Sequence, residues 1–201
     1  MLLVIETATA ALSVALFDGE TLLDHHHEIV GRGHAERLLP VISALLGSRR
    51  PHAIAVDCGP GSFTGIRVGL AAAQGLRIAW GLPTHGFSST ALIAAGAETD
   101  DEGCAVALTG GHGEVFVEMF SAPPLRSLSP VRSLTPADAA LTIHQARVHG
   151  SGAAAGVAAR GWGEAIDALP DARDFARLPA ELARLPLRPL YGRAPDAKLP
   201  S

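Results

Sequence analysis

The residues with the clearest chemical potential lie in the run Gly59-Pro60-Gly61-Ser62-Phe63-Thr64-Gly65-Ile66-Arg67-Val68-Gly69. A glycine-rich turn before a helix can bind an anion, because free backbone N–H groups and the helix dipole point at it. A P-loop also needs a lysine near the end of its turn, but the one lysine of the chain is Lys198. We therefore predict a structural turn in which Ser62 or Thr64 caps the helix, in preference to a phosphate site.

The nine histidines raise the question of a metal site. None stands four residues from another, so the H-x-x-x-H helix site is absent. His25, His26 and His27 fall on a predicted strand, where alternate side chains point to opposite faces and one metal would reach at most two of them. We interpret this segment as a surface strand and predict no metal site. Cys58 and Cys104 form no C-x-x-C pair and are expected to be free core thiols.

The elements that must position these residues begin with three strands joined by tight turns. Helices and strands then alternate, which gives the order β-β-β-α-β-α-β-α. The predicted strands cover residues 1–7, 12–18, 21–28, 53–56 and 84–87, and the predicted helices cover 35–46, 64–80 and 88–95.

An acidic segment with glycine, residues 98–103, separates this half from a second one. We predict strands over residues 105–108, 115–120 and 146–149, helices over 137–145 and 153–159, and a loop over 121–136. The expected domains are therefore residues 1–100 and a smaller, degenerate second domain, residues 101–201.

Composition narrows the class of protein. The 201 residues are 48% hydrophobic, which is enough for a substantial core. The N-terminal apolar run is interrupted at Glu6 without a basic region, so we expect neither a signal peptide nor a membrane span. The expected location is therefore the cytoplasm.

The net charge of -4 does not favour an independent nucleic-acid binder. Residues 173–201 hold six basic and three acidic residues, which we interpret as a solvated surface rather than a tRNA contact.

The sequences of several segments, and their order along the chain, resemble the bacterial TsaB (YeaZ) family of the tRNA threonylcarbamoyladenosine machinery. The resemblance is dense over residues 1–96. It implies an α/β fold like that of actin, Hsp70 and sugar kinases, with a complete ribonuclease-H-like N-terminal half and a reduced C-terminal half. The matching segments are residues 59–69, Val4-Ile5-Glu6-Thr7-Ala8-Thr9, Leu12-Ser13-Val14-Ala15-Leu16, His34-Ala35-Glu36-Arg37-Leu38-Leu39-Pro40, Pro189-Leu190-Tyr191-Gly192-Arg193 and Ala197-Lys198.

The resemblance implies a non-catalytic subunit, without a cofactor or catalytic residues of its own, that pairs with TsaD and works with the ATPase TsaE. The complex would transfer threonylcarbamoyl to adenosine 37 of ANN-decoding tRNAs, and tRNA would be contacted only through the complex. Alone, the chain would form a homodimer. The alternative is a self-sufficient enzyme of the same superfamily, a small-molecule kinase or a metallopeptidase. The missing metal ligands and the shortened second half argue against that alternative.

Three positions depart from the family pattern. Glu6 stands where most relatives have Asp, and Thr109 and Gly111 replace an Asp and an Arg. Because the charged pair is already lost, we expect Thr109 and Gly111 to tolerate substitution.

The two long predicted helices are expected to supply the docking surface for TsaD or for a second copy of the chain. The second helix is apolar over more of its circumference than one sheet covers. Its interior glycines cost about 1 kcal/mol each relative to alanine, which indicates close backbone approach either to the chain's own sheet or to a partner. The predicted interface residues are His34, Arg37, Val41, Ala44, Gly65, Gly69, Ala72 and Leu76.

Overall fold

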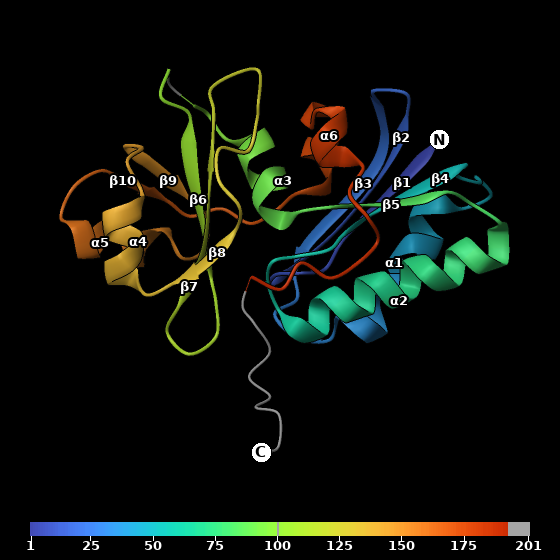
Figure 1. Ribbon diagram of the computed structural model, residues 1–201. Helices are drawn as coiled ribbons and strands as arrows, with labels where there is room; N and C mark the ends of the chain where they lie inside the picture. The colour runs from blue at the N-terminus through green and yellow to red at the C-terminus, as the bar shows by residue number, and fades with distance from the viewer. Residues whose placement is uncertain (100, 193–201) are drawn as a thin grey trace, which may run out of the picture.

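The computed structural model describes residues 1–99 and 101–192 as two five-stranded sheets that face each other across a central layer of short helices (Figure 1). This arrangement confirms the predicted α/β class. Arg193 and Lys198 of the family-like C-terminal segment lie outside the described residues.

The first sheet has the order β3-β2-β1-β4-β5. Its antiparallel part contains β1, β2 and β3, and β4 and β5 continue it in parallel to β1. The strands are Leu2–Glu6, Ala11–Asp18, Thr21–Ile29, Ala53–Asp57 and Thr84–Phe87 in chain order. One helix follows each of β3, β4 and β5 in the chain, so the predicted β-β-β-α-β-α-β-α order is confirmed.

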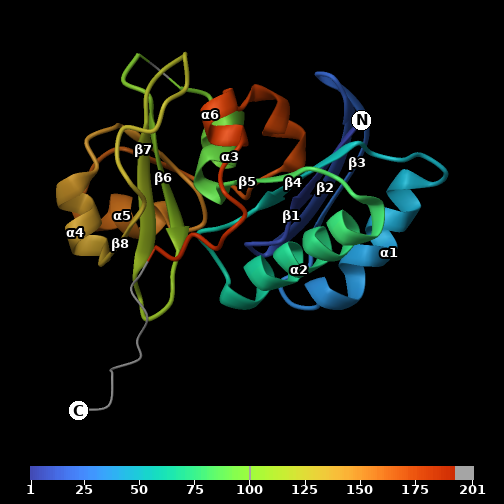
Figure 2. The same cartoon turned by 45° about the vertical axis from the view of Figure 1, so that its right-hand side comes forward.

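Helices α1 (His34–Leu46) and α2 (Phe63–Trp80) cover one face of this sheet, and α3 (Ser89–Gly96) lies on the other face (Figures 1 and 2). Leu38, Ile42 and Leu45 of α1 are buried, as their spacing predicts. Leu39, the apolar residue next to Leu38 in the chain, is 52% exposed. The buried face of α1 is therefore narrower than the face formed by all of its apolar residues.

The second sheet has the order β10-β9-β6-β7-β8. Its outer face carries α4 (Pro136–Thr142) and α5 (Ala153–Arg160), as Figure 1 shows. The strands are Cys104–Thr109 (β6), Val115–Phe120 (β7), Arg132–Leu134 (β8), Arg147–His149 (β9) and Glu164–Ile166 (β10). Strand β8 lies inside the segment predicted as a loop, and β10 was not predicted, because three residues carry too little periodicity to detect.

The C-terminal segment leaves the second sheet and packs back on the first. It forms the 3-10 helix η1 (Ala172–Arg177) and α6 (Ala180–Ala183). The N–H of Ala172 donates to Ser13 Oγ at 2.9 Å, and the N–H of Leu190 donates to the carbonyl of Cys58 at 2.7 Å. Residues of the second predicted domain therefore pack against the first sheet.

One buried cluster joins both sheets and contains Phe87 of β5, Phe120 of β7 and Phe175 of η1.

Within the described part of the chain, no helix is long and apolar enough to span a membrane.

Candidate functional site

The turn between β4 and α2 is held against the end of β1. Ser62 is the N-cap of α2, and its Oγ accepts from the N–H of Gly65 at 3.2 Å. The N–H of Ser62 donates to the carbonyl of Ala8 at 2.6 Å, and Thr7 Oγ1 donates to the carbonyl of Gly65 at 2.9 Å. The predicted cap is confirmed at Ser62, and these bonds connect the turn to the chain's own first strand.

The glycines of this segment are required by close approach of that strand. A Cβ on Gly61 or Gly65 would clash with the backbone carbonyl of Ala8 or Thr7 respectively. A Cβ on Gly69 would lie 2.5 Å from Thr7 Oγ1. The close neighbour of these glycines, which the sequence left open, is therefore the first sheet.

Two buried carboxyl groups, Glu6 and Asp57, lie beneath the turn. Glu6 Oε1 accepts from the N–H of Ala8 at 2.8 Å, and Asp57 Oδ1 accepts from the N–H of Gly59 at 2.5 Å. Burial, and then the nearby Asp57, hold the pKa of Glu6 well above its ordinary value, and burial raises the pKa of Asp57 to about 6. Glu6 Oε2 and Asp57 Oδ2 are buried and accept no hydrogen bond from the described residues, which also favours the protonated form of Glu6. An anion above the turn would face negative charge from the pair.

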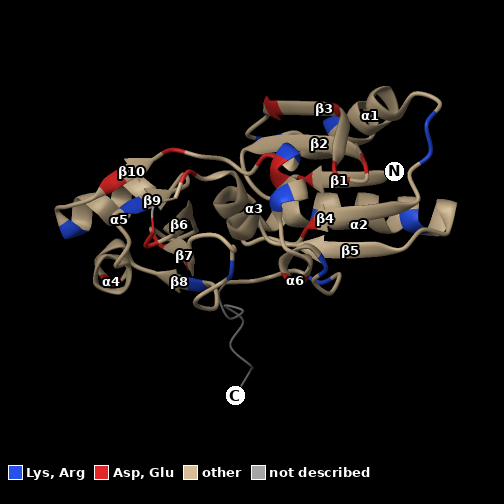
Figure 3. Ribbon diagram, turned by 90° about the horizontal axis from the view of Figure 1, so that it is seen from above, with Lys and Arg blue, Asp and Glu red and all other residues tan. Residues whose placement is uncertain are grey.

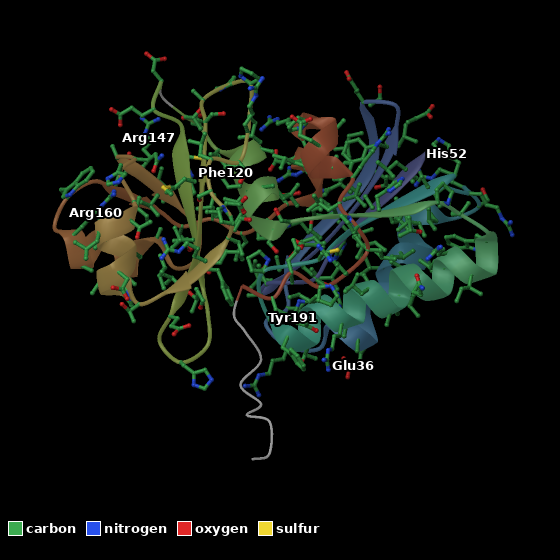
Figure 4. The ribbon with its side chains drawn as sticks, viewed as in Figure 1. Glu36, His52, Phe120, Arg147, Arg160 and Tyr191 are labelled. Carbon is green, nitrogen blue, oxygen red and sulfur yellow. The ribbon has the colours of Figure 1, made fainter. Side chains whose placement is uncertain are left out.

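A cleft of about 970 Å³ lies between the two halves. Among the described residues that line it, Arg67 is the one that carries a formal charge. Its guanidinium lies 3.6 Å over the ring of Phe63, and that ring stacks on Tyr191 with centroids 6.0 Å apart. Figure 4 places Tyr191 beside the N-terminal end of α2. The cleft wall formed by these residues is aromatic, and its cation is already engaged with a ring.

The second half contributes Thr109 and Gly111 to the same cleft. Thr109 Oγ1 donates to the carbonyl of Ser151 at 3.0 Å, and its N–H donates to Ser151 Oγ at 3.2 Å. A Cβ on Gly111 would meet no atom within 4 Å. The structure therefore leaves room for substitution at Gly111, whereas Thr109 has a bonded partner that an Asp side chain could not donate to.

The predicted interface residues do not form one exposed surface. His34 is 7% exposed, and its Nε2 lies 3.0 Å from the carbonyl oxygen of Ala11. Gly65 and Gly69 are buried against the first sheet. These three positions are corrected, because packing within the chain leaves them no surface to offer a partner.

The remaining predicted residues lie on α1 and α2, in two places. Arg37, Val41 and Ala44 border a hollow of about 480 Å³ beside β3, where the Arg37 guanidinium pairs with Glu28 at 2.6 Å. Ala72 and Leu76 are half-buried on the α2 side. A groove of about 370 Å³ separates α1 from α2, and Leu76 is among its lining residues.

Sequence reasoning missed the large apolar side chains that are exposed on these helices. Leu39 of α1 is 52% exposed, and Phe63 and Ile78 of α2 are 56% and 77% exposed. Helical periodicity could not single them out, because both helices are apolar over much of their circumference.

Comparisons with known proteins identify the family. The family model described as TsaD, tRNA N6-adenosine threonylcarbamoyltransferase, matches residues 26–120. The tRNA threonylcarbamoyladenosine biosynthesis protein TsaB of Escherichia coli K12 is 38% identical over 57% of this chain and 52% of its own length. The TsaB protein of Haemophilus influenzae is 37% identical over 63% of this chain and 56% of its own length. The matches thus span about half the length of these curated relatives.

A solved structure extends the similarity over the whole fold. YeaZ from Pseudomonas aeruginosa superposes with a TM-score of 0.79 at 31% identity, over 94% of this chain and 99% of the other. A further Pseudomonas aeruginosa structure, of a protein described as similar to peptidase YEAZ, gives a TM-score of 0.80 at 30% identity. The chain belongs to the TsaB/YeaZ family.

Proposed function

We propose that this chain is the non-catalytic subunit of a complex that forms threonylcarbamoyladenosine in tRNA. It pairs with a TsaD paralogue that carries out transfer to adenosine 37 of ANN-decoding tRNAs, and the ATPase TsaE completes the complex. The observation that carries the proposal is the match to YeaZ over 99% of that chain, together with relatives named for threonylcarbamoyladenosine biosynthesis.

The geometry of the turn and the cleft supports a non-catalytic role. Ser62 is engaged as a helix cap, and Arg67 is stacked on Phe63. Glu6 and Asp57 are buried, and each is bonded to a backbone N–H group of the turn that follows it in the chain. The side chains that could act as nucleophile, base or phosphate ligand are therefore engaged in holding the fold.

The outer side of α1 and α2 supports the pairing. We call the solvent-exposed side chains of α1 and α2, among them Leu39 and Ile78, the helix-pair surface. Large apolar side chains exposed on neighbouring helices are typical of protein contact sites. The α1–α2 groove, which Leu39 and Trp80 border, lies on the same helix pair and offers a concave feature for a partner helix. We assign this surface to TsaD, with a second copy of the chain as its occupant when TsaD is absent.

The test replaces Leu39 or Ile78 by glutamate. Each variant places an unpaired carboxylate in the proposed interface, where desolvation costs on the order of several kcal/mol, so TsaD binding should weaken at least about tenfold. Val41 is unsuitable for this test because it is half-buried and packs against the core. Size-exclusion chromatography and calorimetry with the TsaD paralogue measure association, and a thermal melt measures the fold.

Leu141→Glu is the matched control, because Leu141 is 80% exposed on α4 of the second half. It should leave TsaD binding unchanged. Full TsaD binding by both helix variants would move the interface elsewhere. A wild-type chain that neither binds TsaD nor supports threonylcarbamoyladenosine formation in the reconstituted system would overturn the function itself.

A further inference from the structure

Three donor side chains from distant parts of the sequence meet between β3 and the C-terminal return. His25 Nε2 lies 3.0 Å from Asp171 Oδ1, and His27 Nδ1 lies 3.5 Å from Asp171 Oδ2. One ligand atom from each residue can be chosen so that all three lie within 4.8 Å of one another. No other such group of three occurs among the residues that the structure describes.

The fold itself brings these side chains together. His25 and His27 are two residues apart on β3, so both point to the face of the sheet that η1 covers. Asp171 is the N-cap of η1 and reaches the same point. Figure 3 shows acidic and basic residues side by side in the segment between α3 and β2, where η1 packs. The sequence suggested a surface strand here. The structure shows instead that η1 partly covers β3 at His25 and His27.

The site is partly enclosed and contains a nitrogen without a hydrogen bond. The side chains of His25, His27 and Asp171 are 19%, 25% and 13% exposed. The Nδ1 atom of His27 is buried and has no hydrogen-bond partner. This atom can donate its lone pair to an ion, while the remaining exposure gives an ion a path from solvent.

We propose that His25, His27 and Asp171 bind a zinc-type divalent transition-metal ion that ties the C-terminal return to the first sheet. Two imidazole nitrogens and one carboxylate oxygen are a donor set that suits zinc, with water in the fourth position. Ligand atoms around tetrahedral zinc lie roughly 3.3 Å apart, as follows from bond lengths of about 2.0 Å. The present ligand atoms lie within 4.8 Å of one another, so they must approach one another to reach that value. The sequence predicted no metal because it offered two histidines, and Asp171 supplies the third ligand.

Arg173 competes for the same carboxylate. Its Nη2 and Nε donate to Asp171 Oδ2 at 2.7 and 3.1 Å, and its side chain is 57% exposed. Zinc therefore replaces or shares this ion pair, and the exposed arginine has room to move away. The metal-free chain keeps its return in place through Arg173 and the Ser13 bond to Ala172.

The test titrates ZnCl2 into the full chain, without a polyhistidine tag, against a chromogenic chelator. We expect one zinc per chain, an affinity at least about tenfold lower in His25→Ala and in His27→Ala, and at most about a twofold change in His26→Ala. His26 is the matched control, because it lies between the two ligands on the opposite face of β3 and pairs with Glu28 instead. Arg173→Ala should bind zinc more tightly because the competing cation is gone.

Hydrogen exchange gives a second readout that does not depend on any activity. Zinc should slow exchange over residues 171–177 in the wild type and leave it unchanged in Asp171→Asn, whereas MgCl2 should have no effect in either. The proposal is overturned if His26→Ala loses as much affinity as His27→Ala, if Arg173→Ala binds no more tightly than the wild type, or if no stoichiometric zinc binds.

Discussion

At the scale of a single residue, Glu6 makes the free energy of unfolding depend on pH. Burial and the neighbouring Asp57 raise its pKa well above the ordinary value of 4.5. As the pH rises above 4.5, the unfolded chain releases a proton that the folded chain retains, so the free energy of unfolding falls until the folded pKa is passed. Glutamine has no such proton. We therefore expect the melting temperature of Glu6→Gln, relative to wild type, to increase as the pH rises above 4.5 and to level off once the raised pKa of the folded chain is passed.

The control for this measurement is Glu36→Gln, which removes a carboxyl group on the exposed side of α1 (Figure 4). The comparison of the two melting curves over the same pH series isolates the buried site. A Glu6→Gln difference that stays constant or falls with rising pH would show that Glu6 does not retain its proton in the folded chain.

At the scale of the element, α2 contains two glycines whose surroundings differ completely. A Cβ on Gly69 would lie 2.5 Å from Thr7 Oγ1 and 3.4 Å from Val56 Cγ2, whereas a Cβ on Gly75 would meet nothing within 4 Å. Alanine gains roughly 1 kcal/mol of helix propensity at either position. Overpacking against β1 costs roughly 1–3 kcal/mol, so Gly69→Ala should destabilise the chain. Gly75→Ala should stabilise it by about 0.5–1 kcal/mol.

Urea unfolding of the two single variants and the double variant measures these changes. The two positions are separated along α2, and a Cβ on Gly75 would meet none of the atoms that surround Gly69, so the effects should add. If Gly69→Ala proved as stabilising as Gly75→Ala, α2 could not lie as close to the first strand as the structure has it.

The same elements show what local sequence determines. The helix α2 was predictable because Ser62 caps it, its apolar residues recur at helical spacing and Gly81 ends it in the left-handed conformation. Strands β8 and β10 were not predictable, because each is three residues long and is defined by its partner strand. The interface role given to Gly65 and Gly69 failed for a related reason: glycine spacing reports close approach but not the neighbour that approaches.

At the scale of the whole molecule, the C-terminal return joins parts that sequence reasoning treated separately. Residues 98–103 were read as a boundary, yet η1 and Leu190 come back to bond with the first half. Asp171 thereby meets β3 across 146 positions of sequence. Short segments without strong periodicity carry no signal of such a contact, so a single sequence could supply two ligands of the proposed metal site and not the third.

The cleft between the two halves leads to the last prediction, that the isolated chain does not hydrolyse ATP. Among the described residues that line this cleft, the one charged residue is Arg67, which stacks on Phe63. Triphosphate binding requires several cations, backbone donors or a metal held by carboxylates. Glu6 and Asp57 are buried beneath the turn, and the N–H groups of Gly59, Ser62 and Gly65 are bonded to Asp57, Ala8 and Ser62 respectively. A phosphate-release assay with MgCl2 should therefore give no signal above the buffer blank, and calorimetry should show ATP binding no tighter than about 1 mM.

The Arg67→Ala variant should change neither result. Turnover that survives repurification and disappears in Glu6→Ala would instead make the chain an enzyme, and the buried carboxyl pair would then have a catalytic role.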